Sequence, residues 1–219
     1  MKTIAVIPAY NEERHIKSVL ERTRKYVDKI IVVDDGSTDN TARIARKVPG
    51  IEIIQSKENR GKADAVSIGI KKAFQYKPDT IILMDSDGQH LPEEIPLLLE
   101  HIKKDNAVFV SGERAHTKKP LLRAFAGIVV DFLVGGKDIL CGFKAIKADA
   151  LKKFDLEGSK NYLIEIALHD EARRNKVRID YVPISTVYSK HIKSKIDYKR
   201  EFLSYIAYRF NKLKRSIKQ

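Results

Sequence analysis

The sequence predicts an α/β domain in which a mostly parallel central sheet is flanked by helices. Two observations lead to this prediction. Short apolar runs rich in β-branched residues alternate with segments whose apolar residues recur at helical spacing, from the N-terminus to about residue 112. Polar clusters follow directly after several of these runs, and in such sheets ligands bind beyond the carboxyl ends of the strands.

The first part of the chain supplies most of the predicted sheet. Strands are expected at five apolar runs: Thr3–Ile7, Ile30–Val33, Ile51–Ile54, Ile81–Met84 and Ala107–Val110. Helices are expected between them, around Ile16–Val27, Ile44–Val48, Ala65–Phe74 and Pro92–Lys103. Asn11 is placed to cap the first of these helices, and Thr38 or Asp39 the second.

The pattern changes after Gly112. A basic segment from Arg114 to Arg123 is expected to form a loop that leads into an apolar helix over roughly Leu121–Val134. The elements expected next are a strand or hairpin at Ile139–Ile146, a helix at Tyr162–Arg174, and one or two strands at Val177–Tyr188 interrupted at Pro183. From Asp197 onward the pattern predicts a basic amphipathic helix with an apolar stripe of Leu203, Ile206, Phe210, Leu213 and Ile217.

Composition narrows the function classes. The chain has 42 Lys and Arg against 29 Asp and Glu, and the net charge of +13 indicates an anionic partner such as nucleic acid, a membrane surface or a phosphorylated small molecule. Basic residues interleaved with aromatic ones occur only in the terminal helix, so no nucleic-acid partner is expected. One cysteine, no signal peptide and no apolar stretch long enough to cross a bilayer predict a cytoplasmic protein.

A pair of carboxylates follows the apolar run Ile81–Met84. In an extended backbone, residues two apart point to the same side, so Asp85 and Asp87 can converge on one cation. Together with the amide oxygen of Gln89 they are hard ligands, suited to Mg²⁺ or Mn²⁺ with a phosphate completing the shell. The alternative is a polar turn, because Asp, Ser and Gly favour turns.

Four stretches occur in order at predicted strand ends: Ile7-Pro8-Ala9-Tyr10-Asn11-Glu12, Val33-Asp34-Asp35-Gly36-Ser37-Thr38-Asp39, Gly61-Lys62, and Met84-Asp85-Ser86-Asp87-Gly88-Gln89-His90. With them the chain resembles the inverting glycosyltransferases of family 2, which have the GT-A fold. Within that family it looks most like the polyprenyl-phosphate (dolichyl-phosphate) mannose and glucose synthases. The resemblance covers residues 3–196, so residues 1–196 are expected to form the GT-A domain and residues 197–219 a basic helical tail.

The resemblance also implies roles for individual residues. Binding of the nucleotide sugar is implied for Pro8, Tyr10, Glu12, Asp35, Lys62, Asp85, Ser86 and Lys195. The metal, Mg²⁺ or Mn²⁺, is implied to bind Asp85, Asp87 and Gln89, where it would neutralise the leaving diphosphate. The residues implied in catalysis are Asp87, Arg114, Arg123 and Glu165. The match around Lys195 departs from the family pattern, because this sequence has Ile192 where the family usually has a glycine.

Alternatives exist for several of these roles. Arg114 and Arg123 would screen the repulsion between the lipid phosphate and the anionic sugar nucleotide, or they belong to a solvated basic loop. Glu165 is expected to act as a base or to position the acceptor, and a phosphate acceptor, already ionised at neutral pH, needs no strong base. The tail is expected to lie in an anionic membrane interface, or to pack on its own domain or a second subunit.

The expected activity follows from the resemblance. It implies transfer of a hexose from UDP-glucose or GDP-mannose to a polyprenyl or dolichyl phosphate, with inversion, by an enzyme bound peripherally to the cytoplasmic face of a membrane. The alternative is a glycosyltransferase that acts on a sugar or glycan acceptor.

Overall fold

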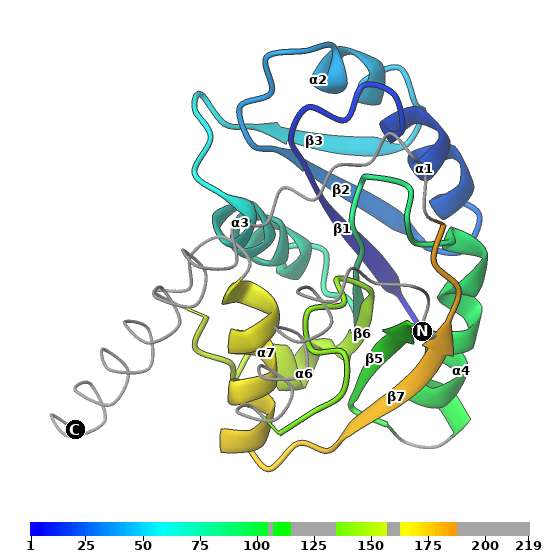
Figure 1. Cartoon of the computed structure of the whole chain (residues 1–219), viewed down its shortest axis with the longest axis vertical. Coiled ribbons are helices and arrows are strands. Elements are labelled where there is room, and N and C mark those ends of the chain that lie inside the picture. Colours follow the sequence, from blue (N-terminus) through cyan, green and yellow to red (C-terminus); the bar gives the residue numbers. More distant parts are fainter. Residues whose placement is uncertain (105–106, 115–134, 157–162, 188–219) are drawn as a thin grey trace, which may run out of the picture.

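The computed structural model describes residues 1–104, 107–114, 135–156 and 163–187. The predicted helix at 121–134, the tail from residue 197, Arg123 and Lys195 lie outside these residues. The described residues form a seven-stranded sheet of order β3-β2-β1-β4-β6-β5-β7 (Figure 1). Its strands are β1 (Thr3–Ala9), β2 (Lys29–Asp34), β3 (Ile51–Gln55), β4 (Thr80–Leu83), β5 (Phe109–Arg114), β6 (Lys144–Lys147) and β7 (Ile179–Ile184). The helices are α1 (Ile16–Thr23), α2 (Thr41–Ala45), α3 (Lys62–Phe74), α4 (Ile95–Lys104), which follows a 3-10 turn at Pro92–Glu94, α6 (Ala148–Leu151) and α7 (Leu163–Arg174).

The sheet is mostly parallel, as predicted. β1 lies between β2 and β4 and is parallel to both, and β3 is parallel to β2. β6 runs antiparallel to its neighbours β4 and β5, and β7 is parallel to β5. The carboxyl ends of β1, β2 and β4 therefore lie side by side at one edge of the sheet.

Helices cover both faces of the sheet, which explains why the central strands are apolar throughout. Alternate strand residues such as Ile7 and Val32 pack against α1, α2 and α4. Their neighbours Val6 and Val33 pack against α3, α6 and α7 on the opposite face (Figure 1). Every residue of β1 is buried as a result.

Three local predictions are corrected by the structure. Asn11 does not cap α1, which begins at Ile16; Asn11 has a positive φ of 54° and its side chain contacts Thr38 in the loop after β2. Arg114 is the last residue of β5 and not part of a loop. Pro183 does not interrupt β7, because this strand lies at the sheet edge, where a residue without an N–H is tolerated.

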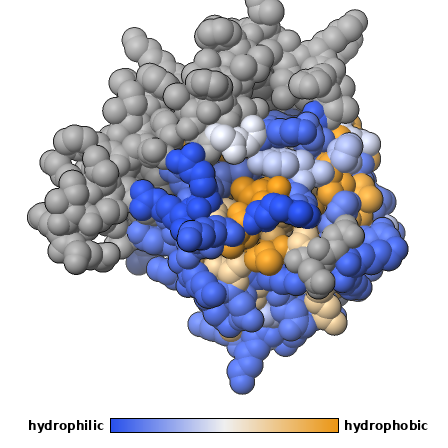
Figure 2. All heavy atoms as spheres, turned by 90° about the horizontal axis from the view of Figure 1, so that it is seen from below, coloured by the Kyte–Doolittle hydropathy of each residue, from blue (hydrophilic) through white to orange (hydrophobic). Residues whose placement is uncertain are grey.

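The surface of the described part is largely hydrophilic in the view from below, with an apolar patch near its centre (Figure 2). Charged residues make up 32% of the chain, in keeping with this surface. Among the described helices, none combines the length and the apolar character that crossing a membrane requires.

Candidate active site

The loops that follow β1, β2 and β4 meet at the carboxyl edge of the sheet. Pro8 is buried near the end of β1, and its carbonyl accepts a hydrogen bond from Ser86 Oγ at 2.8 Å. β4 pairs with β1 only as far as Val6, so the missing N–H of Pro8 faces a position beyond the ladder and costs no strand bond. The proline and Ser86 thus join the end of β1 to the loop after β4.

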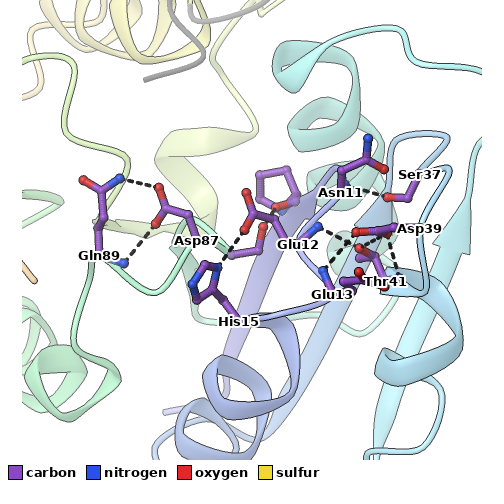
Figure 3. Close-up of polar contacts among 11 residues, drawn as sticks. Asn11, Glu12, Glu13, His15, Ser37, Asp39, Thr41, Asp87 and Gln89 are labelled. Atoms are coloured by element: carbon purple, nitrogen blue, oxygen red, sulfur yellow. Dashed lines mark hydrogen bonds and ion pairs between the residues drawn. The ribbon is translucent and has the colours of Figure 1, made fainter. Parts of the chain in front are cut away.

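The loops after β1 and β2 are tied together by side chains. Asn11 N donates to Ser37 Oγ at 3.0 Å, and Asn11 Oδ1 accepts from Thr38 N at 2.8 Å. Glu12 N donates to Thr41 Oγ1 at 2.7 Å, where α2 begins. The carboxylate of Glu12 contacts His15 Nδ1 at 3.1 Å. Figure 3 shows Glu12 and His15 between this cluster and the side chains of Asp87 and Gln89.

Asp35, expected to contact the nucleotide, is buried and holds the loop that precedes α3. Its Oδ1 accepts from Arg60 N at 2.9 Å and its Oδ2 from Gly61 N at 2.7 Å. Gly61 has a φ of 98°, a conformation that glycine adopts without strain, and α3 begins at the next residue, Lys62. Tyr10, expected to stack on the base, is 36% exposed at the start of the loop after β1.

Lys62 connects three elements. Its Nζ lies 2.5 Å from Asp85 Oδ1 in the loop after β4 and 2.6 Å from Glu165 Oε1 on α7. Burial would lower the pKa of Lys62, but the charges of the two carboxylates outweigh it and raise this pKa. Burial would likewise raise the pKa of Asp85, but Lys62 outweighs it and lowers that pKa. Lys62 and Asp85 are therefore both charged at neutral pH.

Gly142 fixes the position of the Asp85 carboxylate. A Cβ atom at residue 142 would lie 2.3 Å from Asp85 Oδ2 and 2.7 Å from its Cγ. These distances are shorter than real Cβ contacts, so only glycine leaves room for the carboxylate. Gly142, Asp85, Lys62 and Glu165 line the same small pocket, together with Pro8.

Asp87 and Gln89 form a local pair. Gln89 N and Nε2 donate to the two oxygens of Asp87 at 3.0 and 2.7 Å. The amide nitrogen of Gln89 therefore faces Asp87, and the amide must turn before its oxygen can serve as the predicted metal ligand. Burial, and then the nearby charge of Asp85, raise the pKa of Asp87.

The carboxylates that follow β4 are suited to one divalent cation. Asp85 and Asp87 place two carboxylates in one loop, and Asp85 also contacts the Lys62 ammonium. Carboxylate oxygens suit Mg²⁺ or Mn²⁺. Within the described residues, no three His, Cys, Asp or Glu side chains are placed to hold a metal ion by themselves. Oxygens from a bound diphosphate and water would have to supply the remaining ligands.

Arg114, expected near the acceptor, is held by a partner that sequence reasoning missed. Its Nε and Nη2 donate to the two oxygens of Asp138 at 2.7 and 2.6 Å, and its backbone N contacts the same carboxylate. The Arg114 side chain is 12% exposed. This fork fixes the guanidinium at the end of β5, on the same sheet edge as the carboxylates.

Lys144 is a second missed residue. It is fully buried on β6, and its Nζ donates to Ser111 Oγ at 3.0 Å and to the Ile139 carbonyl at 3.3 Å. Burial lowers the pKa of Lys144 to about 8. It lines the same pocket as Glu165, whose Oε2 has no hydrogen-bond partner among the described residues. A lysine is ordinarily assigned to the surface, so no pattern in the sequence indicated its burial.

Sequence comparison with known proteins matches the chain to a family. Residues 4–143 match the model of the family described as glycosyl transferase family 2. The chain is 36% identical over 201 residues to an uncharacterised protein of Methanocaldococcus jannaschii, covering 83% of this chain and 87% of that protein. It is 31% identical over 215 residues to the UDP-N-acetylglucosamine–dolichyl-phosphate N-acetylglucosaminyltransferase of Methanococcus voltae, covering 85% and 86%.

Two further similarities extend the comparison. An undecaprenyl-phosphate mannosyltransferase of Micrococcus luteus is 29% identical over 205 residues, covering 85% of this chain and 84% of that protein. The crystal structure of glucosyl-3-phosphoglycerate synthase from Mycobacterium tuberculosis with Mn²⁺ and UDP-glucose superimposes with a TM-score of 0.73. It is 20% identical and covers 94% of this chain and 78% of that one, a likeness of fold that confirms the predicted GT-A architecture.

Proposed function

Because the chain belongs to glycosyl transferase family 2, and is therefore a glycosyltransferase, we propose that it transfers a sugar from a nucleotide sugar to a polyprenyl phosphate. UDP-glucose and GDP-mannose are the proposed donors. Relatives named for N-acetylglucosamine and mannose transfer to dolichyl and undecaprenyl phosphate support the lipid phosphate as acceptor and add UDP-N-acetylglucosamine to the donors worth testing.

The observation that carries this proposal is the charge arrangement at the end of β4. Asp85 and Asp87 lie in one loop at the carboxyl edge of the sheet, where burial and the charge of Asp85 raise the pKa of Asp87, so a cation bound to both carboxylates would relieve their repulsion. In this proposal Asp85 and Asp87 hold Mg²⁺ or Mn²⁺, and the chemistry that the bound metal supplies is neutralisation of the leaving nucleoside diphosphate. Gln89 joins them only after its amide turns.

The residues beside the carboxylates would bind the rest of the donor. Tyr10 is exposed enough for its ring to stack on the base, and the Glu12 carboxylate can accept from base or ribose donors. Asp35 acts indirectly, because its two oxygens hold the loop before α3 and so fix Lys62. Pro8 and Ser86 keep the loop after β4 in register with β1.

Arg114 would receive the acceptor phosphate. Asp138 accepts from Nε and Nη2, which fixes the plane of the guanidinium, and the positive charge of this fixed group would attract the acceptor phosphate. A phosphate monoester is ionised at neutral pH, so its oxygen can attack the anomeric carbon without a protein base. Glu165 is 3% exposed and contacts Lys62, which favours a positioning role for it over that of a base. Arg123 and Lys195 remain predictions from the sequence.

A lipid acceptor requires docking at the membrane, for which the sequence suggests two segments. The apolar segment 121–134 and the basic amphipathic segment 197–219 have the composition of interfacial helices. We propose that they place the enzyme on the cytoplasmic face of the bilayer. The full chain should then co-sediment with anionic vesicles, and high salt should release it, because salt screens the electrostatic attraction. Vesicle binding that survives removal of residues 197–219 would assign this segment to the domain or to a dimer contact.

The acceptor is tested by where the sugar goes. The full chain is incubated with Mn²⁺, each labelled nucleotide sugar, and one of four acceptors: a polyprenyl phosphate, the same polyprenol without phosphate, 3-phosphoglycerate, or a glycan. Label should enter the organic phase only with the phosphorylated lipid. Label found in the aqueous phase on 3-phosphoglycerate, or on an added glycan, would overturn the lipid acceptor.

A further inference from the structure

Lys62 was expected from the sequence to contact the donor phosphates, yet its ammonium lies between two carboxylates. It is 2.5 Å from Asp85 Oδ1, at the position where a cation bound to Asp85 would sit, and its side chain is only 17% exposed. A metal–oxygen bond is shorter still, about 2.0–2.1 Å for Mg²⁺. The ammonium and a divalent cation on the same oxygen would repel each other at close range, so they compete for it.

Glu165 gives the ammonium a second, independent partner. It comes from α7 rather than from the loop after β4, its Oε1 is 2.6 Å from Lys62 Nζ, and it is 3% exposed. Lys62 can therefore leave Asp85 without losing a counter-charge. An ammonium that left Asp85 in this poorly solvated site without the contact to Glu165 would carry a desolvation cost.

Gly142 leaves room for the Asp85 carboxylate at this place. The Asp85 carboxylate lies where a Cβ at residue 142 would otherwise be, with Oδ2 2.3 Å from that position. A larger residue at 142 would therefore push the carboxylate away from the place where the two cations compete for it.

We propose that Lys62 is an internal counter-cation that occupies Asp85 until a divalent metal displaces it, and that Glu165 is the group that retains the displaced ammonium. This inference rests on the proposed metal-dependent function. It assigns Lys62 a role in setting metal affinity, beyond a contact with the donor phosphates, and it makes Glu165 a positioning residue that acts through Lys62.

The test measures Mn²⁺ binding to the full chain by electron paramagnetic resonance of the free ion, with no nucleotide present. Lys62→Met removes the competitor and should tighten Mn²⁺ binding by about tenfold or more, the scale on which a charge at this distance changes a carboxylate's affinity for a proton. Glu165→Gln removes the carboxylate charge that holds the displaced ammonium and should weaken Mn²⁺ binding. Lys72→Met is the matched control, because Lys72 lies on the same helix, is also ion-paired, and should leave Mn²⁺ affinity unchanged.

The two site variants move in opposite directions, which separates this role from a structural one. Should Lys62→Met fail to fold because two buried carboxylates lose their cation, the isosteric Glu165→Gln and the double variant Lys62→Met/Glu165→Gln still decide the matter. Equal or weaker Mn²⁺ binding without Lys62, or tighter binding in Glu165→Gln, overturns the inference and favours a plain phosphate contact. Absence of Mn²⁺ binding in every protein, with UDP or without, overturns the metal site and this inference with it.

Discussion

Gly142→Ala tests the position of Asp85 without changing any charge. The added Cβ would lie 2.3 Å from Asp85 Oδ2, whereas ordinary contact begins at 3.4 Å, so one of the two groups must retreat. The difference is about 1 Å, and a displacement of that size at reacting groups can cost about 100-fold in rate. We expect kcat for sugar transfer to fall by about this factor, while overpacking lowers the free energy of unfolding by about 1–3 kcal/mol.

The assay compares steady-state transfer and urea unfolding of Gly142→Ala with those of Gly50→Ala. Gly50 has a φ of 79° and open space around it, so alanine there costs about 1–2 kcal/mol of backbone strain and displaces no side chain. Gly50→Ala should keep wild-type kcat at a similar loss of stability. A folded Gly142→Ala enzyme with wild-type kcat would refute the reasoning, because the loop and not Asp85 would then have moved.

Three further predictions concern charged residues. Arg114→Ala should lower the transfer rate by about 100-fold. Arg114→Lys should recover only part of this rate, because an ammonium cannot span the two oxygens of Asp138. Unchanged kinetics in the alanine variant would assign Arg114 a structural role alone. Burial would raise the pKa of Glu52, but Tyr76, Lys72 and Lys29 outweigh it and lower this pKa to about 2 from 4.5. Glu52→Gln should therefore lower the free energy of unfolding by about 1 kcal/mol at pH 7. Urea titrations should show the difference between wild type and variant shrinking as the pH falls from 4.5 towards 2. A difference that stays constant would contradict its origin in the ion pairs of Glu52. Burial lowers the pKa of Lys144 to about 8 from 10.5, so the unfolded chain binds more protons between these values. The stability of the wild type relative to Lys144→Met should therefore rise with pH across that window, and a flat difference would show that folding does not lower this pKa.

The sequence predicted those parts of the fold that depend on local pattern. The continuous apolar runs of β1, β2 and β4 predicted buried parallel strands, and the abrupt change from Met84 to Asp85 located the end of β4. The helix expected around Ala65–Phe74 is α3, which begins three residues earlier, at Lys62, directly after the turn that Gly61 permits.

The parts that could not be predicted depend on contacts between distant segments. Nothing near Lys62 in the sequence indicates that Glu165 on α7 would face it, and nothing near Arg114 indicates Asp138. Lys144 begins the short strand β6, and its burial follows from the position of β6 between β4 and β5. The hydrophobic pattern predicts which face of a helix or strand is buried. Tertiary packing decides which side chains of two different elements meet.

The measurement that tests the central claim most directly is transfer of labelled sugar to polyprenyl phosphate by the metal-free enzyme, before and after Mn²⁺ is restored. Transfer should be absent in excess EDTA and should return with Mn²⁺ in the wild type, and Asp85→Ala and Asp87→Ala should stay inactive although they fold, because both residues lie beyond the strand core. Full transfer in EDTA, or by either alanine variant, would contradict the assignment of the chemistry to this end of β4.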